Sequence, residues 1–131
     1  MATITEPIQS IGSGPNIVPA KVLSQSEIIS IASSIIRVYP SFTSAYLFGS
    51  YTKGTARPDS DIDIAVFLPK LNWSKLVDIG GAHMDLEEVF SKKVDLLVCP
   101  SEDFLERIKK YLILIDIRPQ SGMVSFFAVH V

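Results

Sequence analysis

The chain has 131 residues, of which 47% are hydrophobic and 20% are charged, and its formal net charge is −2. This length suits one domain with its own core, and such a charge gives no broad basic surface for stable binding of DNA or RNA. The apolar runs are too short to cross a bilayer, no secretory signal pattern opens the sequence, and a single cysteine excludes an internal disulfide. We therefore expect a globular protein of the cytoplasm.

The N-terminal part of the sequence predicts a leader followed by a helix. Residues 1–23 carry glycine and proline without a clear hydrophobic period, which favours a flexible leader. Ser24 and Glu27 form a capping-box pattern that predicts the start of an amphipathic helix, and Pro40 ends it. The apolar stripe expected to cover a sheet consists of Ile28, Ala32, Ile35, Ile36 and Tyr39.

The segment 45–68, AYLFGSYTKGTARPDSDIDIAVFL, predicts two strands joined by a turn-rich connection. Because strand side chains alternate between faces, Asp61 and Asp63 project from one side of the second strand, about 7 Å apart. The residues between and after them are apolar and suit a core. One interpretation is a surface strand whose two aspartates are merely solvated. The other is a site for a hard divalent cation such as Mg²⁺, which removes the repulsion between the carboxylates and prefers oxygen ligands.

The connection between the two strands has features of a phosphate site. Gly49 permits a tight turn and close backbone approach, and the Ser50 hydroxyl with the amides after it can donate to phosphate oxygens. Lys53 and Arg57 lie in the same connection and could neutralise a polyphosphate, although a basic loop residue is most often solvated.

The second half of the chain predicts a helix, a third strand and a last helix. We expect the first helix over residues 75–91, with a break at Gly80-Gly81, an exposed His83 and Trp73 closing one end of the core. Its expected core residues are Leu76, Val77, Met84, Val89 and Phe90.

The third strand covers residues 94–99 and is apolar except for Asp95 near its start. Cys99 is expected to be a buried, inert thiol of this strand. The last helix begins after the N-cap Ser101, and its predicted stripe consists of Phe104, Leu105, Ile108, Leu112 and Ile115. The tail 116–131 is sticky and strand-like; it could pair with a sheet edge, dock on a partner, or come from a shifted reading frame.

Gly49-Ser50, ten further residues and then Asp61-x-Asp63 resemble the signature of the DNA polymerase β nucleotidyltransferase superfamily. The short chain, with Gly54, is similar to the minimal nucleotidyltransferases (MNT), which often act as the antitoxin MntA beside a HEPN-domain toxin, HepT. The resemblance covers about residues 24–115 and implies an α/β fold in which helices pack on a small mixed sheet.

The resemblance also implies a chemistry. Asp61, Asp63 and Asp95 would be the catalytic and metal-binding carboxylates for two Mg²⁺ ions. Gly49 and Ser50 would hold the ATP phosphates, with Lys53 and Arg57 opposing their charge. AMP would pass to a tyrosine of the HEPN toxin. Two alternatives stay open: a transferase acting on a small hydroxyl compound such as an aminoglycoside, and an antitoxin that neutralises its toxin by binding alone. The oligomeric state, homo- or hetero-oligomer, is also open.

Overall fold

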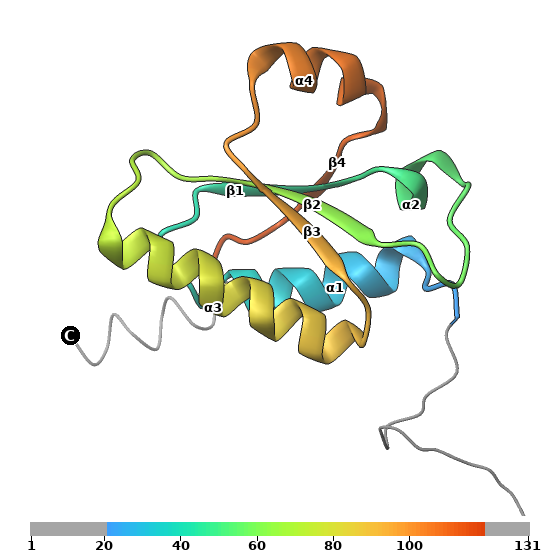
Figure 1. The fold of residues 1–131 in the computed structure, drawn as a ribbon, viewed down its shortest axis with the longest axis horizontal. Helices are drawn as coiled ribbons and strands as arrows, with labels where there is room; N and C mark the ends of the chain where they lie inside the picture. The colour runs from blue at the N-terminus through green and yellow to red at the C-terminus, as the bar shows by residue number, and fades with distance from the viewer. Residues whose placement is uncertain (1–20, 120–131) are drawn as a thin grey trace, which may run out of the picture.

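The computed structural model describes residues 21–119. These form one four-stranded mixed sheet with helices on its faces (Figure 1). The elements are α1 (Gln25–Ile36), β1 (Ser44–Phe48), α2 (Ser50–Lys53), β2 (Ile62–Phe67), α3 (Trp73–Phe90), β3 (Val94–Val98), α4 (Glu102–Ile108), the 3-10 helix η2 (Lys109–Tyr111) and β4 (Ile113–Ile115). The expected α/β fold class is confirmed. Residues 1–20 and 120–131, and with them most of the predicted leader and tail, lie outside the described part.

The strand order is β3-β2-β1-β4. β1 is antiparallel to both of its neighbours, whereas β2 and β3 are parallel and are connected through α3. Helices α1 and α3 cover one face of the sheet, and α4 stands on the opposite side (Figure 1). There the rings of Phe48 and Phe104 pack edge to face, with their centroids 5.8 Å apart. The second face is therefore only partly covered, and it stays open around the N-terminal ends of β2 and β3.

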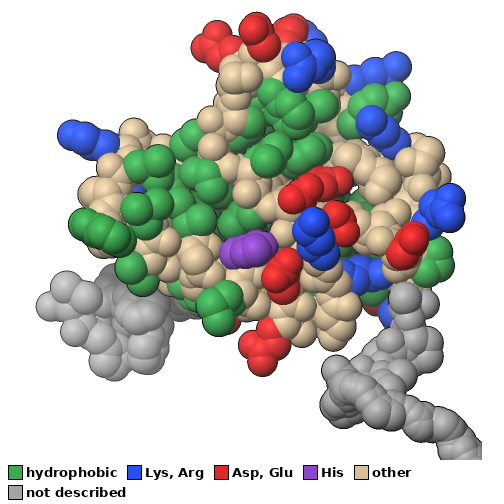
Figure 2. Space-filling view, viewed as in Figure 1, with side chains coloured by type: hydrophobic (Ala, Val, Ile, Leu, Met, Phe, Trp, Pro, Cys, Tyr) green, Lys and Arg blue, Asp and Glu red, His purple; other side chains and the backbone are tan. Residues whose placement is uncertain are grey.

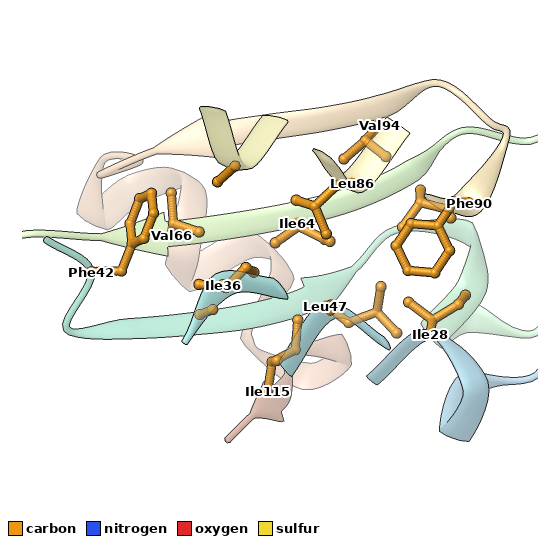
Figure 3. Close-up of a cluster of buried hydrophobic side chains, with 14 of the residues drawn as sticks. Ile28, Ile36, Phe42, Leu47, Ile64, Val66, Leu86, Phe90, Val94 and Ile115 are labelled. Atoms are coloured by element: carbon orange, nitrogen blue, oxygen red, sulfur yellow. The ribbon is translucent and has the colours of Figure 1, made fainter. Parts of the chain in front are cut away.

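The core lies between the sheet and the two long helices (Figure 3). Alternate residues of β2 point into it, as the period-2 pattern predicts. The largest fully buried side chains are Ile28, Ile36, Leu47, Ile62, Ile64, Leu86, Ile115, Val66 and Val94.

Helix α1 begins with the predicted capping box. The Ser24 hydroxyl accepts from the Glu27 amide at 3.1 Å, and the Glu27 carboxylate accepts from the Ser24 amide at 3.0 Å. The helix ends at Ile36, before the expected end, so Tyr39 lies beyond it and its hydroxyl donates to Asp85 of α3 at 2.5 Å.

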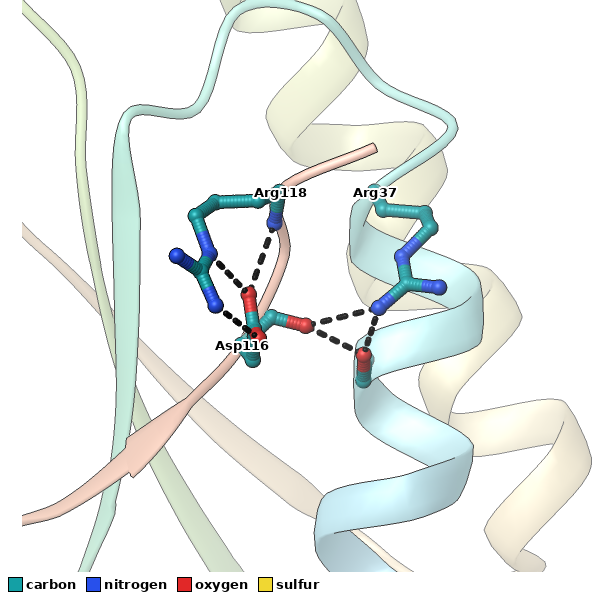
Figure 4. Close-up of polar contacts among 4 residues, drawn as sticks. Arg37, Asp116 and Arg118 are labelled. Atoms are coloured by element: carbon teal, nitrogen blue, oxygen red, sulfur yellow. Dashed lines mark hydrogen bonds and ion pairs between the residues drawn. The ribbon is translucent and has the colours of Figure 1, made fainter. Parts of the chain in front are cut away.

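The C-terminal end of α1 is tied to the chain after β4 (Figure 4). The carbonyl oxygen of Asp116 accepts from the Ser33 hydroxyl and, at 2.9 Å, from Arg37. The Asp116 carboxylate accepts two bonds from the Arg118 guanidinium, at 2.9 and 2.8 Å, and one from the Arg118 amide, at 3.1 Å. This pairing with Arg118 holds the pKa of Asp116 well below its usual range. The contacts fix the edge strand β4 against the helix layer.

Helix α3 departs from the prediction in two ways. It continues without a break through Gly80-Gly81, since its packed face compensates for the low helix propensity of glycine. The predicted core stripe was also wrong for every member except Phe90. Ala82, Leu86 and Phe90 face the core at intervals of one helical turn, while Leu76, Val77, Met84 and Val89 are exposed, as is Trp73.

The last predicted helix was too long. α4 ends at Ile108, and the residues assigned to its final turns form η2 and the strand β4. Ile113 and Ile115 lie opposite Leu47 and Ala45 of β1. This segment forms a strand because β1 otherwise has unpaired backbone groups on this side, and pairing with β4 satisfies them. Cys99 was also predicted wrongly: it follows β3 with φ 49° and is exposed.

Across residues 21–119, every helix is too short or too polar to cross a membrane.

The burial on α3 can be tested with two truncations. Leu86→Ala removes a fully buried side chain and should lower the free energy of unfolding by about 2–5 kcal/mol. Val89→Ala removes an exposed side chain of the same helix and should change it by less than about 0.5 kcal/mol. Urea unfolding followed by circular dichroism measures both. Equal losses in the two variants would contradict the assigned orientation of α3.

Candidate active site

Two of the three predicted carboxylates stand side by side on the open face of the sheet. The parallel register of β2 and β3 pairs Asp63 with Asp95, and paired residues of neighbouring strands project to the same face, about 4.8 Å apart between strands. Asp61 precedes β2 and shares the face of Asp63, because the two are separated by one residue. The structure thus brings the three to one end of the sheet.

Gly49 brings the turn after β1 against this acidic group. β1 pairs its last residue, Phe48, with Asp63, so the following residue lies beside the carboxylate. Gly49 has φ 80°, and a Cβ atom built on it would overlap the Asp63 carboxylate, with Cγ only 2.8 Å away. Both the backbone angle and the available space therefore require glycine.

Ser50 and Lys53 begin and end the short helix α2, which the sequence did not predict. The carbonyl oxygen of Gly49 accepts from the amides of Thr52 and Lys53, at 3.0 and 3.1 Å. The first amides of a helix have no partner within the helix, so the Ser50 end of α2 can offer donors beside Asp63.

The electrostatics of the site centre on Asp63. Burial and, after it, the charges of Asp95 and Asp61 together raise the pKa of its carboxyl to about 6, although the Lys53 ammonium acts in the opposite direction. Asp63 is therefore a carboxylate whose charge is poorly compensated by its surroundings. A cation bound beside it would remove that penalty.

Two lysines before β3 adjoin the acidic group. The Lys93 ammonium lies 3.9 Å from the Asp61 carboxylate. Lys92 donates to the carbonyl oxygen of Pro58 at 2.7 Å, which ties the connection between α2 and β2 to the start of β3. Figure 2 shows acidic and basic side chains gathered beside the purple histidine on this face of the molecule.

The two predicted phosphate-binding side chains lie differently. Lys53 is near enough to Asp63 to lower its pKa, and its ammonium lies 5.5 Å from the centroid of the Tyr111 ring. Arg57 is exposed and lies 3.9 Å from the Asp59 carboxylate. The structure brings Lys53 to the acidic group and leaves Arg57 in a solvent-exposed turn.

Several residues that support the site were not predicted from the sequence. His83, expected to be exposed and unattached, is hydrogen-bonded to the carbonyl oxygen of Val94 at 2.8 Å. Glu87 accepts from the Val94 amide at 2.9 Å. The two side chains thus hold the backbone residue before Asp95. Their spacing of four residues on α3 is the only sequence signal of this role, and it also fits an ordinary surface pair.

The donor set fits Mg²⁺. Within residues 21–119, no three His, Cys, Asp or Glu side chains are grouped closely enough to hold a metal ion by themselves. Mg²⁺ is usually bound through one or two carboxylates plus water and substrate phosphates. Asp63 and Asp95, beside a turn that can face phosphate, match that kind of open site.

Comparisons with known proteins decide the family. The family model "Polymerase beta, Nucleotidyltransferase" matches residues 26–117. This chain belongs to the polymerase β nucleotidyltransferase family. Its activity is therefore nucleotidyl transfer, and the acidic group with its glycine turn is the candidate centre for it. A search of curated proteins found no match.

Solved structures share the fold of this nucleotidyltransferase. A toxin–antitoxin complex with AMP-PNP matches at 24% identity with a TM-score of 0.55, over 81% of this chain and 82% of that one. A structure of a tri-AMPylated HEPN toxin with its MNT antitoxin from Shewanella oneidensis matches at 21% identity and 0.52, with the same coverage. A putative minimal nucleotidyltransferase matches at 20% identity and 0.57, over 70% of this chain and 95% of that one. The minimal nucleotidyltransferase likeness expected from the motif is thereby confirmed.

Replacing Gly49 tests the close contact with Asp63. Gly49→Ala should cost about 1–3 kcal/mol of stability because of its positive φ. It should also lower nucleotidyl transfer at least about 100-fold, because the new methyl group displaces the Asp63 carboxylate. Gly54→Ala is the matched control: φ is 78° there, but nothing lies within 4 Å of the added Cβ. The control should lose stability and keep activity, and equal activity losses would contradict the role of the contact.

The charge on Asp63 has a pH-dependent cost. Its pKa is about 6 in the folded chain and near 3.8 when unfolded, so the folded state binds the extra proton and wild-type stability falls as pH rises from about 4 to about 6. This difference in pKa corresponds to a loss of up to about 3 kcal/mol in the free energy of unfolding. Solvent screening of this half-exposed group reduces the loss to about 1 kcal/mol. Metal-free Asp63→Asn should therefore melt about 4 °C above wild type at pH 8, and at the same temperature at pH 4. If Asp63→Asn is no more stable than wild type at pH 8, the ionised Asp63 carboxylate does not destabilise the fold and the prediction is wrong.

Proposed function

We propose that this nucleotidyltransferase transfers AMP from ATP to a tyrosine hydroxyl of a HEPN-domain toxin, and so acts as its antitoxin. In this reaction a bond forms between the acceptor oxygen and the α-phosphorus. The bond from that phosphorus to the bridging oxygen breaks, pyrophosphate leaves, and the tyrosine gives up its proton.

The observation that carries the proposal is the juxtaposition of Asp63 and Asp95 with the Gly49-Ser50 turn. The carboxylates of β2 and β3 and the backbone and hydroxyl donors after β1 lie side by side at one end of the open face of the sheet. A triphosphate bridging these two groups would place its phosphate oxygens at the donors and share a cation with the carboxylates.

Mg²⁺, two ions in the proposed reaction, would supply charge neutralisation at the attacking and leaving oxygens. Asp61 and Asp63 would hold both ions. Asp95 would complete the site near the acceptor and favour loss of its proton. Lys53 would oppose the charge on the phosphates, and Arg57 has the weaker claim because its charge faces Asp59.

The shape of the site favours a macromolecular acceptor. Two shallow hollows flank it: one of about 280 Å³ includes Lys93 and Asp95 in its lining, and one of about 230 Å³ includes Asp61 and Lys93. Both are smaller than the usual pocket for a small organic ligand. An acceptor that brings its own surface to the edge of the sheet suits this geometry better than an aminoglycoside does.

The relatives support the same reaction. One is a toxin–antitoxin complex with AMP-PNP, an ATP analogue, and another contains a tri-AMPylated HEPN toxin beside an MNT antitoxin. Transfer of AMP to such a toxin is thus the natural activity to test for this chain.

The experiment incubates the chain with Mg²⁺, a cognate HEPN toxin and ATP labelled either at the α- or at the γ-phosphate. Label from α-labelled ATP alone should appear on a toxin tyrosine, located by peptide mass spectrometry. Asp63→Asn should reduce this transfer at least about 100-fold. The matched control is Asp59→Asn, an exposed aspartate of the neighbouring turn, which should retain activity.

The same variants separate catalysis from neutralisation by binding. If Asp63→Asn binds the toxin as wild type does but no longer silences it, antitoxin action depends on the transfer. Full neutralisation by that variant would leave only the binding interpretation. If the toxin is labelled from γ-labelled ATP instead, the transferred group is not AMP and the proposal is wrong.

A further inference from the structure

The outer face of α3 carries a second apolar stripe that the core does not use. Trp73, Val77 and Met84 are 81%, 67% and 71% exposed, and Leu76 beside them is 47% exposed. With 3.6 residues per turn, positions 73, 77, 80 and 84 fall on one line along the helix, on the side opposite the buried Ala82 and Leu86. The spacing of four, three and four residues is that of a helix-packing seam.

One glycine interrupts the bulky residues of this stripe. Gly80 faces open space, with nothing within 4 Å of a Cβ placed on it, so it forms a notch between Val77 and Met84. Small residues at such a notch let another helix approach closely. The notch therefore suits a bulky residue from a second helix.

The exposed stripes of two α3 helices are complementary to each other when the helices run antiparallel. A two-fold axis between residues 78 and 79 places Val77 over Gly80 of the partner subunit. The same axis places Trp73 against Met84 of the partner subunit, a favourable sulfur–aromatic pair. Each bulky residue thus meets a small or matching one, as an isologous interface requires.

The charges on α3 point the same way. Its first turn bears Lys75, and Lys70 lies in the loop just before it, whereas its last turns bear Glu87 and Glu88; neither end of the helix has the charge that the helix dipole favours. An antiparallel second copy would place the acidic end of one helix beside the basic end of the other and oppose the two dipoles. Glu88 is exposed and available for this, whereas Glu87 is held by Val94.

We propose that the chain forms a two-fold symmetric dimer through antiparallel α3 helices, with Val77 of each copy seated at Gly80 of the other. The proposal is separate from that of the acceptor, because the exposed side chains of Trp73 and Val77 lie outside the candidate site, although Gly80 also borders the hollow that contains Asp95.

Sedimentation equilibrium and the fluorescence of Trp73, the only tryptophan of the chain, test the dimer. With rising protein concentration, the full chain should shift from monomer to dimer, and its emission should shift to the blue as Trp73 becomes buried. Val77→Lys should weaken dimerisation at least about 10-fold. Val38→Lys is the matched control, since Val38 is 62% exposed and lies outside α3, and it should dimerise as wild type does.

Gly80→Leu fills the notch without a clash in its own chain. It should raise the melting temperature of the monomer, because leucine favours helix over glycine by about 1 kcal/mol, and at the same time abolish the concentration-dependent blue shift. Glu88→Lys should weaken the dimer about threefold, and adding Lys70→Glu should restore it.

A wild-type chain that stays monomeric throughout the micromolar range would overturn the proposal. So would a Gly80→Leu variant that still dimerises. If wild type is monomeric and Val77→Lys loses toxin binding, the stripe belongs to the toxin and not to a second copy.

Discussion

The acidic end of the sheet rests on one constraint, the parallel pairing of β2 with β3. That register sets Asp63 beside Asp95, and the antiparallel pairing of β1 then sets Gly49 against the same carboxylate. Placing these groups together lowers the stability of the fold, because burial and the charges of Asp95 and Asp61 raise the pKa of Asp63 to about 6. A cation bound beside Asp63, as proposed, would relieve this cost and would bind more strongly for that reason.

The helices behind the sheet hold this strained end in place. His83 and Glu87 of α3 bind both backbone groups of Val94, immediately before Asp95. Lys92 binds the loop that leads to Asp61. Side chains beside the acidic group therefore fix the backbone that carries Asp61 and Asp95. The acidic side chains are thus positioned by hydrogen bonds to the neighbouring backbone and not, among the described residues, by hydrogen bonds to their own carboxylates.

Local signals in the sequence were sufficient for much of this structure. The capping box at Ser24 and the alternation after Asp61 each depend on a few neighbouring residues, and both were predicted correctly. The pairing that joins Asp63 to Asp95 has no local signature and followed from the family resemblance. β4 was missed because a three-residue strand exists only through the edge of β1. The burial on α3 was missed because that helix has apolar residues on two faces, and hydrophobicity alone does not tell which one meets the core.

Helix α1 is attached at both of its ends. The Gln25 side chain donates to the Tyr51 carbonyl of α2 at 2.8 Å, and Ser33 and Arg37 bind the chain after β4. Because one added residue would turn the far end of a helix by about 100°, an insertion or deletion within α1 would break one of the two attachments. Homologous chains can therefore be expected to vary the composition of its solvent side freely while conserving its length.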